Sequence, residues 1–294
     1  MTGRFAPSPT GRMHLGNVYC AVLSWLSAQQ QGGRWLLRIE DLDPQRSRRE
    51  YAGQMMDDLR WLGLEWDEEP VCQSERTDLY AEYFKRLSET AHVYPCYCRR
   101  ADLLAAGAPH ASDGMPIYPG TCRHLATAPT GRTPAWRVEV PDRSITFTDL
   151  YKGEVTRNLA HDVGDFIVRR SDGVYAYQLA VVVDDALTGV TEVVRGEDLL
   201  TSAAQQIFLY ERLSLPCPTF GHVPLLCAAD GRRLCKRDKE MDMECLRSRY
   251  TPEELLGIIA HKAGLQEDER EISLENLLKA PLRLTPKWEE DLNG

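Results

Sequence analysis

Alternating strand and helix signals in the N-terminal part of the chain constrain its fold most strongly. A short strand signal ends near Ala6, and a loop rich in proline and glycine leads into a helix predicted from about residue 14 to residue 30. The apolar run at residues 35–39 predicts a buried strand, and residues 47–62 predict a second helix that Ser47 opens and Gly63 ends. This order predicts an α/β fold in which a parallel sheet carries helices on both faces.

Polar residues lie at the ends of the two predicted strands, where parallel sheets bind their ligands. Residues 4–8 follow or end the first strand, and Glu40 follows the second. His14 and Gly16 stand where the first helix begins. A helix N-terminus attracts phosphate, because its unpaired N–H groups and its dipole both favour negative charge. The sequence therefore predicts an anion site at this helix start.

A second stretch, residues 230–237, complements the first. It is a glycine-containing loop with four cations, which are Arg232, Arg233, Lys236 and Arg237. Such a composition suits a loop that closes over a polyphosphate. The sequence has neither a GxGxxG fingerprint nor a P-loop, which argues against dinucleotide cofactors and ordinary NTPases. We interpret the two stretches as halves of one ATP-binding site.

The sequence pattern changes along the chain and predicts four segments. We expect residues 1–94 to form the first half of the domain that carries the sheet, and residues 95–170, rich in Cys, Pro, Gly and short strand signals, to form an insertion. Just beyond the end of the insertion, Asp172-Gly173 predicts a hairpin between strands at residues 166–169 and 174–177. Residues 171–244 form the second half, with a strand at 191–195 and a helix at 199–213, and residues 245–294 form a helical segment whose helix start is at 251–254.

Composition narrows the class of protein. The chain has 294 residues, of which 43% are hydrophobic and 27% charged, and no apolar run approaches the length of a membrane span. Its start lacks the regions of a secretory leader, which predicts a cytoplasmic location. Nine cysteines, an odd number, favour reduced thiols or a metal site over a disulfide framework.

The net charge of −9 opposes RNA binding in general, so any RNA contact depends on local basic clusters. Three clusters stand out, at residues 46–49, 99–100 and 232–239. Each is either part of a basic track for nucleic acid or a set of solvated charges at helix ends.

The two stretches resemble the signature motifs of the class I aminoacyl-tRNA synthetases, which are written HIGH and KMSKS. The first motif matches residues 14–17 and the second residues 233–237, with Asn17, Arg233 and Cys235 departing from the consensus. Residues 4–11, 37–43, 175–185 and 189–198 resemble the glutamyl-type enzymes in particular. The resemblance implies a Rossmann-like catalytic domain with an inserted, zinc-bearing acceptor-type subdomain and a short C-terminal helical segment.

The resemblance also implies roles for individual residues. His14 and Lys236 would stabilise the phosphates in the transition state, and Gly16, Asn17 and Arg233 would complete the ATP site, with Mg²⁺ entering with ATP. The implied glutamate pocket consists of Arg4, Ala6, Ser8, Glu40, Tyr177 and Arg195. This set suits a substrate with two carboxylates and one ammonium group. The alternative for Glu40 and Arg195 is an ordinary ion pair at a sheet end.

The resemblance to the glutamyl-type enzymes also implies a structural zinc site formed by Cys96, Cys98, Tyr118 and Cys122. Three thiolates and one further donor would complete a tetrahedron, with the Tyr118 oxygen as an unusual ligand. His110 and His124 are rival fourth ligands, and free buried cysteines are the alternative to any metal.

The chain after Lys236 is shorter than the ~100 residues of a typical domain, so we expect no anticodon-binding domain. In this the sequence resembles the short glutamyl-Q tRNA(Asp) synthetases. That resemblance implies a monomer that activates L-glutamate with ATP in the absence of tRNA. It also implies transfer of the glutamate to queuosine at the wobble position of the tRNA(Asp) anticodon stem-loop.

Two alternatives remain open for the acceptor and the activity. Val181 stands where many glutamyl-tRNA synthetases have Asn, which makes the ordinary tRNA(Glu) substrate less certain. The first alternative is a truncated or discriminating glutamyl-tRNA synthetase that charges tRNA(Glu). The second is a catalytically idle, synthetase-like RNA-binding protein.

Overall fold

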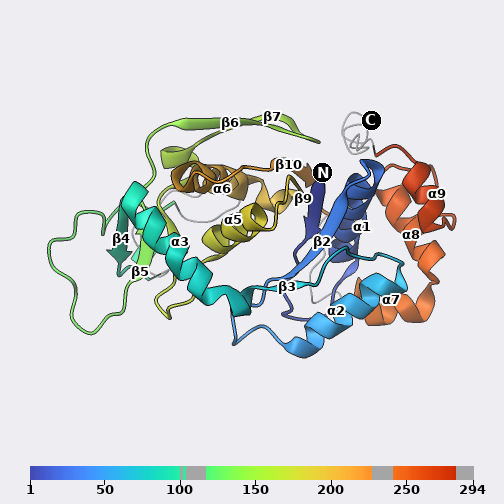
Figure 1. Cartoon of the computed structure of the whole chain (residues 1–294), viewed down its shortest axis with the longest axis horizontal. Helices are drawn as coiled ribbons and strands as arrows, with labels where there is room; N and C mark the ends of the chain where they lie inside the picture. Colours follow the sequence, from blue (N-terminus) through green and yellow to red (C-terminus); the bar gives the residue numbers. More distant parts are fainter. Residues whose placement is uncertain (100–101, 104–116, 227–240, 283–294) are drawn as a thin grey trace. The chain divides into compact units, whose positions relative to one another are not determined.

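The computed structural model describes residues 1–99, 102–103, 117–226 and 241–282 (Figure 1). The described residues form two compact units. The first comprises Met1–Ser74, Val190–Glu197 and Phe220–Gly294, and the second comprises Glu75–Gly189 and Asp198–Thr219. The segment boundaries expected near residues 94, 170 and 244 stay a prediction.

A parallel sheet forms the centre of the first unit. Strands β1 (Thr2–Phe5), β2 (Arg34–Ile39) and β3 (Val71–Cys72) are hydrogen-bonded in the order β1-β2-β3, and both strand pairs are parallel. Strand β9 (Glu192–Gly196) pairs with β10 (Thr219–Val223) and runs beside β1. At that junction the Thr2 amide donates to Thr191 Oγ1, and the Thr191 amide donates to the Thr2 carbonyl, both at 2.9 Å. The predicted parallel sheet is confirmed.

Helix α1 (Leu15–Gln30) packs on β1, β2 and β9. The residues that predicted it, at helical spacing, are all buried, namely Leu15, Val18, Val22, Leu23 and Leu26. Helix α2 (Arg49–Trp61) starts later than expected. Its N-cap is Arg48, which makes no side-chain cap hydrogen bond, so the prediction that Ser47 opens the helix is wrong. Gly63 follows the helix end with a φ of +77°, as the sequence predicted.

Within residues 241–282, the C-terminal part of the first unit contains helices α7 (Met243–Arg249), α8 (Pro252–Lys262) and α9 (Leu274–Lys279) (Figure 1). Thr251 caps α8, since its Oγ1 accepts from the Glu254 amide while the Glu254 carboxylate accepts from the Thr251 amide. The predicted helix start at residues 251–254 is confirmed. Arg247 of α7 donates to Asp58 of α2 at 2.7 Å, and Asp58 is 1% exposed.

The second unit combines helices with antiparallel strands. Strands β4 (Val93–Cys96), β5 (Ala135–Val138) and β8 (Phe166–Arg169) pair in the order β4-β5-β8, and β6 (Ser144–Asp149) pairs with β7 (Gly153–Asn158). Among the described residues of this unit, the helices with given bounds are α3 (Thr77–Thr90), a short π-helix (Leu159–Val163), α5 (Tyr177–Leu187) and α6 (Leu200–Leu213). The 3-10 turns Gln73–Arg76 and Glu197–Leu199 lie where the chain passes between the units.

The hairpin expected around Gly173 is only partly correct. Gly173 has a φ of +90°, and the Arg170 amide donates to the Val174 carbonyl at 2.8 Å, so the turn forms. The second strand is reduced to one bridge between Arg169 and Tyr175, because the chain enters α5 at Tyr177. The apolar residues that follow are buried as a helix rather than as a strand.

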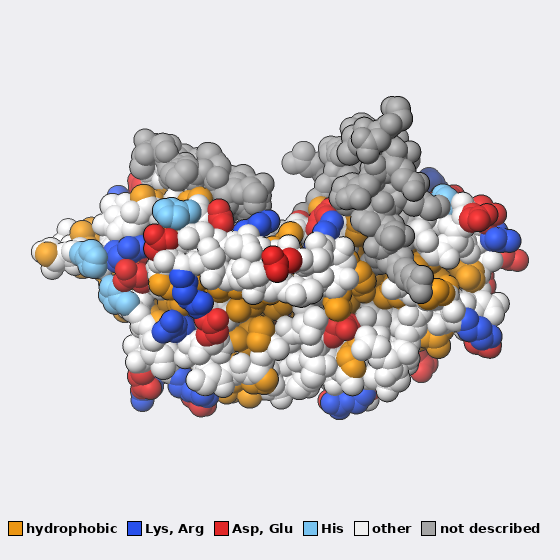
Figure 2. Space-filling model, turned by 90° about the horizontal axis from the view of Figure 1, so that it is seen from above, with side chains coloured by type: hydrophobic (Ala, Val, Ile, Leu, Met, Phe, Trp, Pro, Cys, Tyr) orange, Lys and Arg blue, Asp and Glu red, His pale blue; other side chains and the backbone are white. Residues whose placement is uncertain are grey.

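Charges of both signs alternate over the described part of the face in Figure 2. Among the described residues, none of the helices has both the length and the hydrophobicity needed to cross a bilayer.

Candidate functional site

His14 lies at the start of α1 and acts as its N-cap. Its Nδ1 accepts from the Gly16 amide at 3.1 Å, and its own amide donates to Asn17 Oδ1 at 3.1 Å. These two bonds form a capping box. Because Nδ1 accepts, a proton of the neutral ring lies on Nε2, at the opposite edge, where it can be donated to an anion.

Gly16 leaves room for the His14 ring, and Asn17 binds the His14 backbone. A Cβ on Gly16 would lie 3.0 Å from His14 Cε1 and 3.1 Å from Nδ1, so the ring rests where a side chain would stand. Asn17, the departure from the HIGH consensus, supplies the acceptor for the His14 amide. The helix start predicted to bind phosphate is therefore formed by local backbone and side-chain contacts.

The chain beyond the second motif returns to this helix start. Asp242 forms an antiparallel bridge with His14, and the Met243 amide donates to the Met13 carbonyl at 2.9 Å. Arg12 pairs with Glu244 at 3.2 Å. Lys236 and Arg233 lie outside the described residues, but the segment that follows them is anchored beside His14.

Four of the predicted glutamate-site residues lie together at the carboxyl ends of β1 and β2. Arg4 is in β1 and 4% exposed, and Ala6 and Ser8 follow that strand. Glu40 follows β2, and its amide donates to the Pro7 carbonyl at 3.0 Å. The Glu40 side chain is 8% exposed and pairs with Arg38 at 3.2 Å, so the ion-pair alternative applies to Glu40 in part.

Arg195 occupies β9 with two aromatic neighbours from β10. It is 5% exposed, and its Nε donates to Nε2 of His222 at 3.0 Å. Its guanidinium also lies 5.2 Å from the Phe220 ring centre. His222 must present an unprotonated Nε2 to accept this bond, which fixes the orientation of the guanidinium plane.

Tyr177 belongs to the second unit, where it is the first residue of α5 and half-buried. Val181, which replaces the expected Asn, is fully buried in the same helix. The neighbouring Gln178 donates to Ser202 Oγ at 3.0 Å and accepts from Gln206 at 2.9 Å, so the start of α5 is joined to α6 by amide groups.

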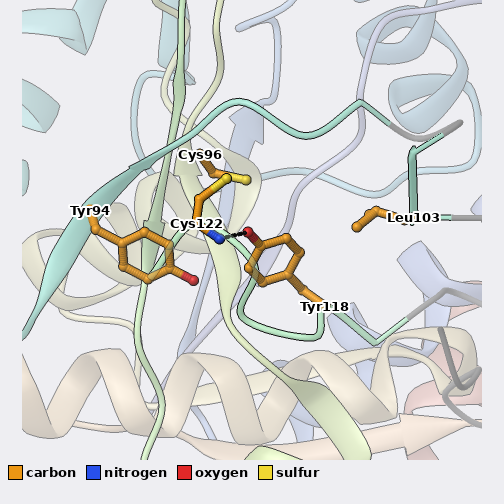
Figure 3. Packing of buried hydrophobic residues seen from close by; sticks show 5 residues of the cluster. All are labelled: Tyr94, Cys96, Leu103, Tyr118 and Cys122. Carbon is orange, nitrogen blue, oxygen red and sulfur yellow. Dashed lines mark hydrogen bonds between the residues drawn. The ribbon is translucent and has the colours of Figure 1, made fainter. Parts of the chain in front are cut away.

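The second unit also brings the three predicted cysteine ligands together. The sulfur atoms of Cys96, Cys98 and Cys122 all lie within 4.8 Å of one another, and no second group of this kind exists in the described ranges. Cys98 Sγ is 3.6 Å from Cys122 Sγ and 3.8 Å from the Tyr118 hydroxyl. Figure 3 shows the Cys96 and Cys122 sulfurs turned toward one another and the Tyr118 hydroxyl turned toward Cys122.

This spacing fits a tetrahedral zinc site. With Zn–S bonds of about 2.3 Å, tetrahedral geometry places sulfur ligands roughly 3.8 Å apart. The Tyr118 hydroxyl accepts from the Cys122 amide at 2.7 Å, which fixes the oxygen beside the sulfurs. His124 is not part of the group and stacks on His92, and His110 lies outside the described residues.

Burial and mutual hydrogen bonding shift the acidity of these groups. Burial raises the pKa of the Cys98 thiol to about 11. Burial and bonds to the cysteines also raise the pKa of the Tyr118 phenol. Burial opposes ionisation of Cys122, but bonds from Tyr118 and the Tyr97 amide outweigh it and lower the pKa of that thiol. A metal that bound here would displace the proton of the Cys98 thiol.

Comparison with known proteins identifies the family. Residues 1–284 match the family described as tRNA synthetases class I (E and Q), catalytic domain. The chain belongs to these class I synthetases. The glutamyl-Q tRNA(Asp) synthetase of Symbiobacterium thermophilum is 49% identical over 295 residues, which cover 95% of this chain and 91% of that protein. The resemblance to glutamyl-Q tRNA(Asp) synthetases is confirmed.

Longer class I synthetases share the same fold. A glutamate tRNA ligase from Elizabethkingia meningosepticum, solved in complex with its amino acid, is 27% identical with a TM-score of 0.78. The match covers 95% of this chain but 64% of that one. The glutamate–tRNA ligase of Aquifex aeolicus is 42% identical over 287 residues, with 60% of its length covered. The class I catalytic domain is thus the fold of this chain.

Several residues of the site escaped the sequence analysis. Arg38 precedes Glu40 by two positions in an extended segment, so both side chains point to one side, and this spacing was the available signal. Asp242 and His222 gave no local signal, because their contacts with His14 and Arg195 join segments distant in sequence.

Proposed function

We propose that this chain condenses L-glutamate with ATP and then transfers the glutamate to queuosine at the wobble position of tRNA(Asp). In the first step a glutamate carboxylate oxygen attacks the α-phosphorus and pyrophosphate leaves. In the second step a hydroxyl of the queuosine cyclopentene diol attacks the acyl carbon, AMP leaves, and the hydroxyl proton is lost. The observation that carries the proposal is the near-complete match to a glutamyl-Q tRNA(Asp) synthetase, together with the capped His14 at the helix start.

His14 and the N-terminus of α1 would bind the phosphates. Phosphoryl transfer needs little covalent chemistry from the protein, and positioning with charge stabilisation supplies most of the rate. Nε2 of His14 is the donor toward phosphate, and the bridge to Asp242 supports a place for Lys236 and Arg233 near the same phosphates. Mg²⁺ would enter with ATP and neutralise part of the phosphate charge.

The glutamate site would use the strand ends of the first unit. Arg4 and Arg195 would bind the carboxylates, and Glu40, fixed by Arg38, would bind the ammonium group. Ala6 and Ser8 would line the site. Two guanidinium groups would favour glutamate over glutamine, because a second carboxylate forms a charge-assisted bond that the neutral amide cannot form.

The RNA acceptor would be the anticodon stem-loop. Unpaired loop bases are the parts of RNA that proteins read most readily. Arg46, Arg48 and Arg49 are exposed, and none forms an ion pair within the described part of the chain. The Arg48 amide also donates to the Pro9 carbonyl at 2.9 Å, which places this cluster beside the loop that precedes His14. These arginines would bind phosphates around the modified nucleotide.

Cys96, Cys98, Cys122 and Tyr118 would hold one structural zinc ion, which would stabilise the fold of the second unit without entering the reaction. The enzyme would act as a monomer in the cytoplasm.

Transfer of labelled glutamate tests the proposal. The acceptors are isolated tRNA(Asp) anticodon stem-loops with queuosine or guanosine at the wobble position, and full tRNA(Glu). We expect ATP-dependent labelling of the queuosine stem-loop and of neither other acceptor. Because the stem-loop lacks the 3′ acceptor end of a tRNA, its labelling cannot come from ordinary aminoacylation. Labelling of tRNA(Glu) but not of the stem-loop would support a glutamyl-tRNA synthetase instead. Absence of glutamate-dependent ATP–pyrophosphate exchange would support the catalytically idle alternative.

A further inference from the structure

Arg137 is a buried arginine directed at the cysteine cluster. It lies in β5 and is 8% exposed. Its Nε donates to Cys96 Sγ at 3.3 Å, and its guanidinium carbon lies 4.0 Å from the centre of the Tyr118 ring. One side chain therefore contacts two of the four predicted zinc ligands.

No carboxylate neutralises Arg137 among the residues that the structure describes. Its third contact is a hydrogen bond of 2.7 Å from Nη1 to the Asp165 main-chain carbonyl. The nearby Asp165 carboxylate is occupied by other donors, since it accepts from Arg123 at 2.9 Å, from the Val140 amide at 3.0 Å and from the Tyr94 hydroxyl. A buried guanidinium is costly without a negative partner, and the Cys96 sulfur is the group of the described cluster that accepts from it.

The charge of the proposed metal site has the complementary sign. Three thiolates around one Zn²⁺ leave a net negative charge, even with a neutral Tyr118 phenol. That charge is enclosed by buried residues, namely Tyr94, Leu103, Tyr118 and Cys122 around Cys96 (Figure 3). A cation that donates to one of the sulfurs offsets it where water is excluded.

We propose that Arg137 is the counter-ion of the metal–thiolate cluster and positions Cys96 for metal binding. This inference rests on the proposed zinc site and extends it to a residue that binds no metal itself. The Nε hydrogen bond stabilises the Cys96 thiolate, and the bond to the Asp165 carbonyl holds the guanidinium in place. Groups that contact metal ligands in this way commonly tune metal affinity.

Three variants test the role of Arg137. Arg137→Met removes the charge and the donor, and Arg137→Lys keeps the charge without the Nε geometry. Arg169→Met is the matched control, because Arg169 lies in β8, also donates to a main-chain carbonyl and also faces an aromatic ring, but contacts no cysteine of the cluster. Zinc affinity is measured on the full chain by competition with a chromogenic chelator, and the thiolate-to-metal charge-transfer band is recorded after substitution with Co²⁺.

We expect Arg137→Met to lower zinc affinity by about 10- to 100-fold, with Arg137→Lys between it and wild type. The Co²⁺ band of Arg137→Met should move to longer wavelength, because a thiolate that loses a hydrogen bond gives up its electrons more readily. A general loss of packing would not produce this shift. Arg169→Met should leave both the affinity and the band unchanged.

Two results would overturn the assignment by different routes. A wild-type protein that binds no zinc would remove the proposed metal site and the role of Arg137 with it. A wild-type protein that binds zinc, with equal affinity and an unshifted Co²⁺ band in Arg137→Met, would remove only the role of Arg137.

Discussion

The start of α1 and the cysteine cluster hold their polar side chains by opposite means. At the helix start, the His14 amide donates to the Asn17 side chain, and the His14 ring accepts from the Gly16 amide. Gly16 also leaves room for the ring, because it has no side chain. In the cluster, Cys98 contacts Cys122 and Tyr118, which are themselves candidate ligands. The first arrangement is complete without a ligand, whereas the second gathers groups that repel one another once they ionise. The His14 ring is thus held by cap contacts, whereas the cysteine cluster is held by contacts among the candidate ligands themselves.

This difference predicts different consequences of mutation. Changes at the helix start should reduce the rate of glutamate activation and leave the fold intact. Changes in the cluster should reduce metal binding and stability of the second unit, with smaller effects on the chemistry.

The largest effect should follow the loss of His14. In His14→Ala, ATP–pyrophosphate exchange should fall by about 10²- to 10³-fold, as when one donor to a developing charge is removed. His14→Asn is the informative companion, because Asn is a good N-cap but lacks the Nε2 donor. The His14→Asn variant should be as stable as wild type, but its ATP–pyrophosphate exchange should be as slow as that of His14→Ala. Exchange near the wild-type rate in His14→Asn would show that His14 serves only as a cap.

Lys236→Ala should lower exchange to a similar degree and should affect glutamate binding much less, since its charge is directed at phosphate. Unchanged exchange in this variant would remove Lys236 from the active site.

Loss of a cluster cysteine should come next. A structural zinc site contributes ~10–16 kcal/mol over four ligands, so Cys98→Ser should cost about 3 kcal/mol of binding, or roughly a hundredfold in zinc affinity. Metal analysis should show loss of zinc. Limited proteolysis should cleave the chain within residues 93–138 at an earlier time than it cleaves the first unit. Cys217→Ser is the control, because Cys217 is exposed and outside the cluster. Full zinc content in Cys98→Ser would favour free cysteines over a metal site.

A smaller effect should follow from crowding the His14 ring. The Cβ of Gly16→Ala would meet the ring at 3.0 Å and must displace it by a few tenths of an ångström. We expect exchange to fall about tenfold, because misplaced catalytic groups lose much of their benefit. Gly53→Ala makes the same chemical change in α2, where a Cβ would meet nothing within 4 Å. It should leave the rate unchanged and raise stability slightly, since Gly is a poor helix residue. Equal rates in the two variants would contradict the proposed contact.

Local patterns predicted much of the fold and of the first site. The helix start at His14 and the buried strand at residues 35–39 each depend on a few consecutive residues, and both formed as expected. Ser47 failed as a helix start because the chain turns helical only after Arg48. No helix was predicted at Tyr177–Leu187, where a run of valines also suits a strand, yet the chain forms a largely buried helix there.

Contacts between distant segments account for what the sequence did not predict. The family resemblance predicted that Cys96, Cys98 and Cys122 would lie together, and their sulfur atoms do. The approach of Arg137 to Cys96, however, depends on the pairing of β5 with β4, which no local pattern specifies.

The smallest effect should come from removing the cap of α8, which distinguishes this capping box from the one at α1. Thr251 caps α8 with the same pair of hydrogen bonds that His14 uses at α1, but its hydroxyl has no further task in the proposed reaction. Thr251→Ala should therefore lower the free energy of unfolding by about 1 kcal/mol and leave the exchange rate unchanged. Thr251→Ser keeps the hydroxyl and should restore most of that stability. Chemical denaturation with parallel exchange assays measures both quantities. If Thr251→Ala also slowed ATP–pyrophosphate exchange, loss of a helix cap alone could account for the slow exchange in His14→Ala. In that case, only a His14→Asn variant with wild-type stability and slow exchange would still identify His14 as a donor to phosphate.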